Sequence, residues 1–226
     1  AFLTFLRAPP QQILKAWLAK EEKVIIGDKD PRSIEFLPQL HRLFPQASVI
    51  HIYRDPRDVL LSRKKAEWSK DRSIYNHLFV NTVQLKLARR QLNMFGSKSI
   101  EVAYEQLTAS TEEVLQRICT FLTVDYESGM LDFTGSAQKL VSAEEMQWKK
   151  ETLAPLTESR VGRWKKELKQ WEIALVEENV STAFNHYGYS VSNPSLSLVK
   201  RILAGPVSAV LALASSIYVW WRSRLL

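Results

Sequence analysis

Three short runs of β-branched and aromatic residues set the strongest limit on how this chain can fold. They cover residues 23–27, 48–53 and 99–104, and helical patterns separate or flank them at 9–20, 33–44, from 56 onward, 74–93 and 111–122. Strands that alternate with helices of this length pair in parallel. We therefore expect an α/β sandwich with a central parallel sheet, and ligands at the carboxyl ends of its strands.

Composition narrows the classes of partner and excludes several kinds of site. The formal charge of +7 favours an anionic partner, which leaves a phosphorylated cofactor, a nucleic acid or a membrane surface open. Cys119 is the single cysteine of the sequence, so neither an internal disulfide nor a cysteine metal cluster can form. The four histidines lack metal-ligand spacing, and no Walker, Gly-x-Gly-x-x-Gly or Gly-x-Ser-x-Gly pattern occurs. We expect no metal.

The segment 52–65 places an arginine where a predicted strand ends and a helix begins. Free N–H groups and the positive end of the helix dipole would attract an anion there, Arg54 would pair with it, and Ser62 would add a hydroxyl. The alternative is that Asp55 only caps the helix and that the following basic residues, Arg57, Arg63, Lys64 and Lys65, form a solvated face.

Three further motifs follow predicted strands or precede a helix. Lys29, in the turn after the first run, would neutralise charge on an oxygen as a transferred group leaves, unless the turn is merely exposed. Tyr104 would stack on a base, or else pack half-buried. A basic segment would lie over a phosphate and a purine, unless it is an ordinary basic helix start, and its residues are Arg160, Gly162, Arg163 and Trp164.

The C-terminal segment 202–221 has no charged residue and carries Tyr218, Trp220 and Trp221 near one end. Its length fits a membrane span, although glycine, proline and serine residues dilute its apolar character. We expect a C-terminal hydrophobic helix that spans a membrane, with a membrane-surface or partner-docking helix and a buried terminal helix as alternatives.

Together these motifs resemble those of the PAPS-dependent sulfotransferases, where PAPS is 3′-phosphoadenosine 5′-phosphosulfate, and among them the branch of tyrosylprotein sulfotransferases and bacterial relatives. The resemblance covers residues 24–189. It implies a three-layer, P-loop-like nucleotide-binding fold in which Arg54 and Ser62 hold the donor's 3′-phosphate and Lys29 of Lys-Asp-Pro assists sulfuryl transfer. It also implies that Tyr104 of Tyr-Glu-Gln-Leu lies near adenine and that the motif 160–164 closes over the nucleotide.

The family's first strand and its Pro-Arg-Ser-Gly-Thr-Thr loop for the 5′-phosphosulfate have no counterpart in this sequence. We therefore expect truncation before Ala1, with the general base upstream and little activity in this chain alone. The predicted organisation is a partial sulfotransferase domain at 1–190 and a linker with a hydrophobic helix at 191–226. The expected partners are PAPS and an acceptor hydroxyl or amine, and no nucleic acid.

Two other functions stay open at this point. One is a membrane-tethered nucleotide-binding protein without catalysis, and the other is a nucleotide kinase, which would share the fold. For location, a cytoplasmic domain held at a membrane by the C-terminal helix is expected, with a soluble cytoplasmic protein as the alternative.

Overall fold

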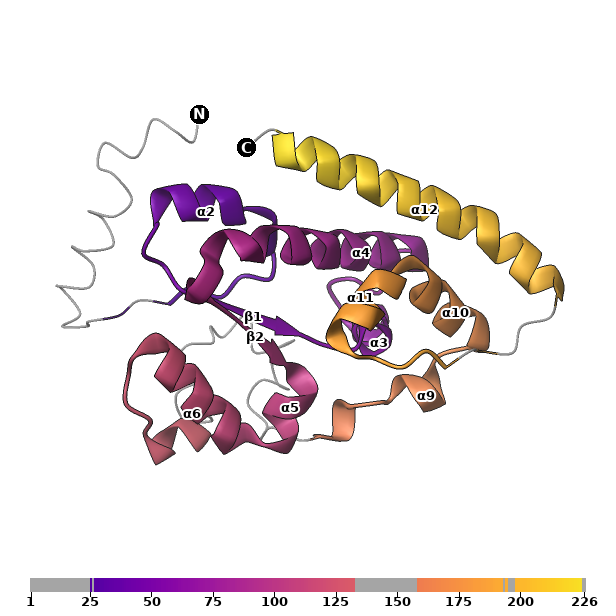
Figure 1. Ribbon diagram of the computed structural model, residues 1–226. Helices are drawn as coiled ribbons and strands as arrows, with labels where there is room; N and C mark the ends of the chain where they lie inside the picture. Colours follow the sequence, from indigo (N-terminus) through magenta and orange to yellow (C-terminus); the bar gives the residue numbers. More distant parts are fainter. Residues whose placement is uncertain (1–24, 26, 133–157, 193, 195–197, 225–226) are drawn as a thin grey trace.

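The computed structural model of the protein describes residues 25, 27–132, 158–192, 194 and 198–224. Two parallel strands form the sheet of this part of the chain, and helices surround them (Figure 1). In chain order the elements are η1 Ser33–Glu35, α2 Leu37–Leu43, β1 Val49–Tyr53, α3 Pro56–Lys65, α4 Ile74–Gln91, η2 Leu92–Lys98, β2 Ser99–Ala103, α5 Tyr104–Ala109, α6 Thr111–Leu122, η3 Ser128–Leu131, η5 Glu158–Arg160, α9 Trp164–Glu167, α10 Gln170–Asn179, α11 Ser181–Tyr187 and α12 Leu198–Arg224.

The two strands confirm the predicted parallel pairing. Val49 lies opposite Ser99 and Tyr53 lies opposite Ala103, so both strands end at the same edge of the sheet. Helix α4 covers one face, and α5 and α6 lie on the other side (Figure 1). A parallel pair requires a crossover connection, and α3 and α4 supply it. Polar side chains that follow the strands therefore come together at one edge.

The largest apolar cluster lies behind that edge and joins α3, α4, α9, α10 and α11. Its buried members are Leu60, Leu61, Leu78, Trp164, Leu168, Ile173, Leu175, Val176, Val180, Ala183 and Phe184. A second cluster connects α2, α4 and η2, and Val49 of β1 packs against it. These contacts fix α3 relative to segments more than a hundred residues later in the chain.

The predicted strand at 23–27 does not form at the residues of it that the structure describes. Ile25 and Gly27 lie outside any strand, and the Ile25 side chain is 59% exposed. An apolar run becomes a strand only where a neighbouring strand pairs with it. Among the described residues β1 pairs with β2, and no strand pairs with the other edge of β1.

Helix α12 forms where a hydrophobic C-terminal helix was expected, but the predicted membrane span is not supported. No helix in the described parts of the chain combines the length and apolar character that crossing a bilayer requires. Gly205, Pro206 and the serines lower its hydropathy. Part of the helix packs on α4, where Val219 is buried against Val83 and Leu87. The domain boundary near residue 190 remains a prediction.

Candidate functional site

Local sequence explains why α3 begins where β1 ends. The Asp55 carboxylate caps the helix by accepting a hydrogen bond from the backbone N–H of Arg57 at 2.9 Å, and Pro56 occupies the first turn, where no amide donor is needed. The Glu105 carboxylate of α5 accepts a hydrogen bond from the Asp55 backbone N–H at 2.8 Å. The start of α3 is thereby held against the element that follows β2.

Arg54 lies at the centre of this edge. Its guanidinium carbon is 4.5 Å from the centre of the Tyr104 ring, and its Nη2 donates a hydrogen bond to the backbone carbonyl of Arg160. A carboxylate oxygen of Asp58 is 3.8 Å from the same nitrogen. The Nε of Arg54 is buried without a hydrogen-bond partner. The structure thus brings together Arg54, Tyr104 and Arg160, which the sequence places far apart.

Asp58 joins α3 to the segment before α9. Its side chain is 1% exposed, and its two carboxylate oxygens accept hydrogen bonds from the backbone N–H groups of Gly162 at 2.6 Å and Trp164 at 3.0 Å. Gly162 has a φ of +71°, a conformation that favours glycine. Burial raises the pKa of Asp58, although these two N–H groups and Arg54 act in the opposite direction.

Arg57 is buried beneath this edge of the sheet. The alternative interpretation, which placed Arg57 on a solvated basic face, is therefore wrong for this residue. Its side chain pairs with Asp55 and with Glu177 of α10, each at 2.7 Å, and donates to the carbonyl of Ser190 at 3.0 Å. The Trp164 indole lies 3.7 Å from its guanidinium carbon. Because Trp164 is only 7% exposed, its ring is a core side chain in this conformation. It positions the segment 160–164, and its predicted nucleotide contact remains untested.

Three other predicted site residues, Ser62, Arg163 and Lys29, differ in how they are placed relative to Arg54. Ser62 is exposed on α3, one helical turn beyond Asp58, on the side that Arg54 and Asp58 share. Arg163 donates a hydrogen bond from Nε to Glu167 at 2.7 Å. Lys29 is exposed in an irregular segment, and it makes no hydrogen bond or ion pair with the other described residues. The described contacts do not bring Lys29 to the Arg54 group.

Sequence reasoning missed Asp58, Glu105 and the pairing of Arg57 with Glu177. Asp58 follows Arg54 by four positions at a helix start, a spacing that can signal an i, i+4 pair. Glu177 lies 120 positions after Arg57, and nothing local in the sequence indicates their contact. In the described ranges no group of three histidine, cysteine, aspartate or glutamate side chains could hold a metal ion.

A basic strand end, a capped helix and an aromatic ring on one sheet edge define a class of α/β protein suited to a phosphorylated ligand. A family model described as "Sulfotransferase family" matches residues 5–128, which is more than half of the chain. The protein therefore belongs to the sulfotransferase family.

Similar curated proteins agree with this assignment. A Caenorhabditis briggsae protein named "Putative protein-tyrosine sulfotransferase" is 33% identical over 108 residues, which are 46% of this chain and 39% of that protein. A Caenorhabditis elegans protein of the same name is 32% identical over 108 residues, 46% of this chain and 42% of that protein. An uncharacterized protein of Aquifex aeolicus is 23% identical over 152 residues, 62% of this chain and 19% of that protein. The chain thus spans about two fifths of the length of the two nematode relatives.

Proposed function

We propose that this protein transfers a sulfuryl group from PAPS to a hydroxyl or amine acceptor. The observation that carries the proposal is the meeting of Arg54, Tyr104 and the segment 160–164 at the carboxyl end of β1, beside the capped start of α3. A 3′-phosphate beside this helix start would find the positive end of the helix dipole and a guanidinium whose Nε has no hydrogen-bond partner.

Each residue has a proposed part in holding the donor. Arg54 and Ser62 contact the 3′-phosphate, and Tyr104 lies against adenine. The segment formed by Arg160, Gly162, Arg163 and Trp164 closes over the nucleotide. The first of these roles is supported by the 3.8 Å distance from Arg54 to Asp58 and by the position of Ser62 one helical turn beyond Asp58, because a guanidinium and a hydroxyl would then face one anion. Asp58 does not contact the donor; it holds the closing segment through two backbone N–H groups.

The proposed reaction is a direct in-line transfer. The bond between sulfur and the bridging phosphate oxygen breaks, and a bond between sulfur and the acceptor oxygen or nitrogen forms. The electron pair of the broken bond stays on the oxygen of the departing 3′-phosphoadenosine 5′-phosphate, and the acceptor loses its proton to a base. Lys29, in the Lys-Asp-Pro context, would stabilise the charge that grows on the bridging oxygen. For this role Lys29 must move toward the donor from its exposed position.

Isothermal titration of 3′-phosphoadenosine 5′-phosphate into the full chain tests the donor site, with AMP as the ligand that lacks the 3′-phosphate. We expect a preference for the 3′-phosphorylated nucleotide, reduced roughly 10- to 100-fold by Arg54→Ala and less by Ser62→Ala. Arg42→Ala, an exposed arginine on α2, is the matched control. A folded protein that binds both nucleotides equally, or whose preference survives Arg54→Ala, would contradict the proposal.

A second candidate is a nucleotide-binding protein without catalysis. One observation favours it: the described contacts leave Lys29 away from Arg54. The two functions differ in what happens to labelled PAPS. Release of 3′-phosphoadenosine 5′-phosphate that requires an acceptor indicates transfer, whereas tight binding with no release in the presence of acceptor mixtures indicates a binding protein.

A further inference from the structure

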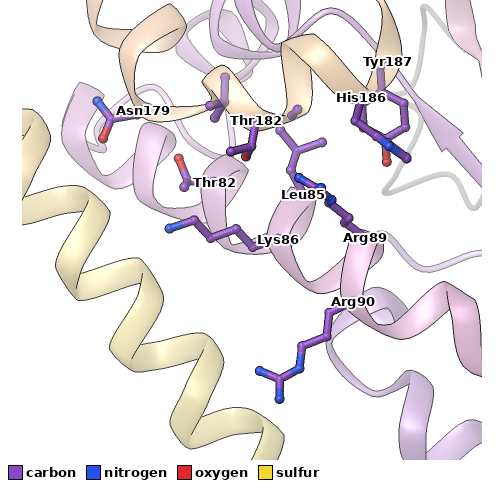
Figure 2. Close-up of a pocket in the computed structure, with 11 residues that line it drawn as sticks. Thr82, Leu85, Lys86, Arg89, Arg90, Asn179, Thr182, His186 and Tyr187 are labelled. Atoms are coloured by element: carbon purple, nitrogen blue, oxygen red, sulfur yellow. The ribbon is translucent and has the colours of Figure 1, made fainter.

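A cavity of about 280 Å³ lies between α4, α10 and α11 (Figure 2), and neither Arg54 nor Tyr104 is among its lining residues. The side chains that give it its chemical character come from α4 and from the ends of α10 and α11: Thr82, Lys86, Arg89, Arg90, Asn179 and His186. Among the residues that the structure describes, no aspartate or glutamate lines it. Its size suits a small ligand and is below that of most drug-sized sites.

Two polar atoms in the wall of this cavity are buried and have no hydrogen-bond partner. Thr82 is 2% exposed and its Oγ1 is unpaired, and Asn179 is 8% exposed and its Oδ1 is unpaired. A buried polar group without a partner destabilises a fold, so such atoms often mark a place where a ligand or water supplies the missing bond. Figure 2 shows Thr82 and Asn179 on neighbouring elements at the cavity.

The orientation of the Asn179 amide is fixed by its own bonds. Its Nδ2 donates to the backbone carbonyl of Leu175 at 2.8 Å and to the Oγ of Ser208 at 3.1 Å. Because the Leu175 carbonyl can only accept, a rotation of the amide would lose that bond, and Oδ1 stays the unpaired atom. A ligand must therefore donate a hydrogen bond to satisfy Asn179 Oδ1. The Thr82 hydroxyl, in contrast, can donate a hydrogen bond to an anionic oxygen of the ligand.

Three basic side chains of α4, Lys86, Arg89 and Arg90, line the same cavity as these two atoms. Thr82, Lys86 and Arg89 lie on one face of α4, at i, i+4 and i+7. Lys86 donates from Nζ to the hydroxyls of Ser215 and Ser216 at 2.8 and 3.0 Å, and burial lowers its pKa. Among the described residues, neither Lys86 nor its neighbours Arg89 and Arg90 forms an ion pair with a carboxylate. The positive field at the cavity is left for an anion.

Two acids of the surrounding elements, Glu101 and Glu178, already have other partners. Glu101 of β2 accepts a hydrogen bond from Tyr187 at 3.0 Å and lies 3.5 Å from His186. Glu178 of α10 accepts a hydrogen bond from Ser208 at 2.8 Å. They therefore do not neutralise the α4 cations directly.

We propose that this cavity is a second ligand site, for a phosphate monoester that also carries a hydroxyl group. The phosphate oxygens pair with Arg89 and accept from Thr82, and the ligand's O–H donates to Asn179 Oδ1. A sulfate ion has no donor at neutral pH and leaves Asn179 unsatisfied. The site is distinct from the proposed 3′-phosphate position at Arg54, and its residues belong to none of the sequence motifs discussed above.

Glycerol 3-phosphate is the probe, titrated calorimetrically into the full chain against sodium sulfate at matched ionic strength. We expect saturable binding of glycerol 3-phosphate and at least fivefold weaker binding of sulfate. Arg89→Gln removes an exposed charge without disturbing the core and is expected to weaken binding about tenfold, and Thr82→Val about fivefold. Arg42→Gln on α2 and Arg54→Ala at the proposed donor site are the controls, and neither is expected to change the affinity more than twofold.

Several outcomes overturn the inference. One is the absence of saturable binding in a protein whose folding is verified by circular dichroism. Another is binding that Arg54→Ala abolishes and Arg89→Gln leaves intact, because the anion would then occupy the Arg54 group. Equal affinity for sulfate and glycerol 3-phosphate overturns the role of Asn179 Oδ1. Because Arg54→Ala is measured in parallel, failure here is distinguishable from failure of the proposed donor site.

The same chemistry can come from a soluble metabolite or from a lipid headgroup, and vesicles separate the two sources. Lysophosphatidic acid keeps a free hydroxyl on its glycerol, so vesicles that contain it offer both groups that the proposal requires. Co-sedimentation with these vesicles that free glycerol 3-phosphate competes away, and that Arg89→Gln reduces, identifies a lipid headgroup as the ligand. Calorimetric binding without co-sedimentation assigns a soluble phosphate monoester.

Discussion

Asp58 is the side chain that makes the α3 start and the segment 160–164 one structure. In Asp58→Asn the amide offers one acceptor where the carboxylate offers two, and it sets an N–H₂ group against a backbone donor. We expect the free energy of unfolding to fall by roughly 1–3 kcal/mol, measured by urea denaturation. Asp71→Asn, at an exposed position, is the matched control and is expected to change stability by less than about 0.5 kcal/mol. Equal stability of both variants would show that Asp58 does not hold this segment.

Arg57 carries a buried charge that three groups compensate. Arg57→Met leaves the Asp55 and Glu177 carboxylates buried without their cation, so we expect a loss of about 3–5 kcal/mol in the free energy of unfolding. Arg57→Lys keeps the charge and loses the planar fork, and an intermediate loss is expected. The measurement is the urea midpoint, with Arg42→Met as the exposed control. An Arg57→Met protein as stable as the control would mean that the pairs contribute nothing.

Helix α12 carries one valine that is buried against α4 and another that is exposed, so the effect of burial on stability can be compared within one helix. Val219 is 7% exposed against α4, whereas Val210 is 66% exposed. Val219→Ala removes two buried methyl groups and is expected to cost roughly 2 kcal/mol, while Val210→Ala is expected to stay within about 0.5 kcal/mol of the parent. Thermal or urea unfolding measures both. If the two substitutions have equal effects, the docking of α12 on α4 contributes little to stability.

Elements with local signals could be predicted from the sequence, and elements that depend on distant partners could not. Asp55 and Pro56 predict the start of α3, and runs of β-branched and aromatic residues predict β1 and β2. Ser110 is the N-cap residue of α6 and Glu113 follows it at capping-box spacing, but the Ser110 side chain makes no cap hydrogen bond. There the Thr111 hydroxyl bonds back to the Leu107 carbonyl at 2.8 Å instead.

Across the whole molecule, a polar cluster ties both strands to α11. His51 donates to Glu101 at 3.0 Å, Tyr187 donates to the same oxygen at 3.0 Å, and His186 lies 3.5 Å from the other. The hydrogen bond from His51 lowers the pKa of Glu101, aided by the bond from Tyr187 and the charge of the histidines and opposed by burial. Because the folded pKa lies below the unfolded value, this stabilisation is complete above about pH 4.5 and is lost as the pH falls through the folded value.

The test of this cluster compares the parent with Glu101→Gln. We expect the urea midpoint of the parent to fall more steeply between pH 6 and pH 3.5 than that of Glu101→Gln, because the variant has no carboxylate to protonate. Parallel slopes for the two proteins would show that Glu101 has the same pKa in the folded and unfolded states.

The candidate site also contains some contacts that the sequence predicts and others that only the tertiary fold determines. The strand-end position of Arg54 and Tyr104 follows from parallel pairing, which brings the ends of β1 and β2 to one edge. Residues 160–164 are held beside them by the hydrogen bonds of Asp58. Trp164 is buried because it packs on Arg57 and on a core to which α10 and α11 contribute. Such contacts are decided by the tertiary fold, so a motif can identify their participants without revealing which of them face a ligand.

The bonds of Asp58 to Gly162 and Trp164 also bear on how the protein folds. They join residues that are 104 and 106 positions apart in the chain. The chain loses conformational entropy when such long loops close, and this cost precedes any stabilisation of the fold by the contacts. The strand pair, the cap of α3 and the start of α5 can form within the first half of the chain. The segment 160–164 can join them only after it has been synthesised, so this edge of the sheet is expected to reach its native form later than the strand pair.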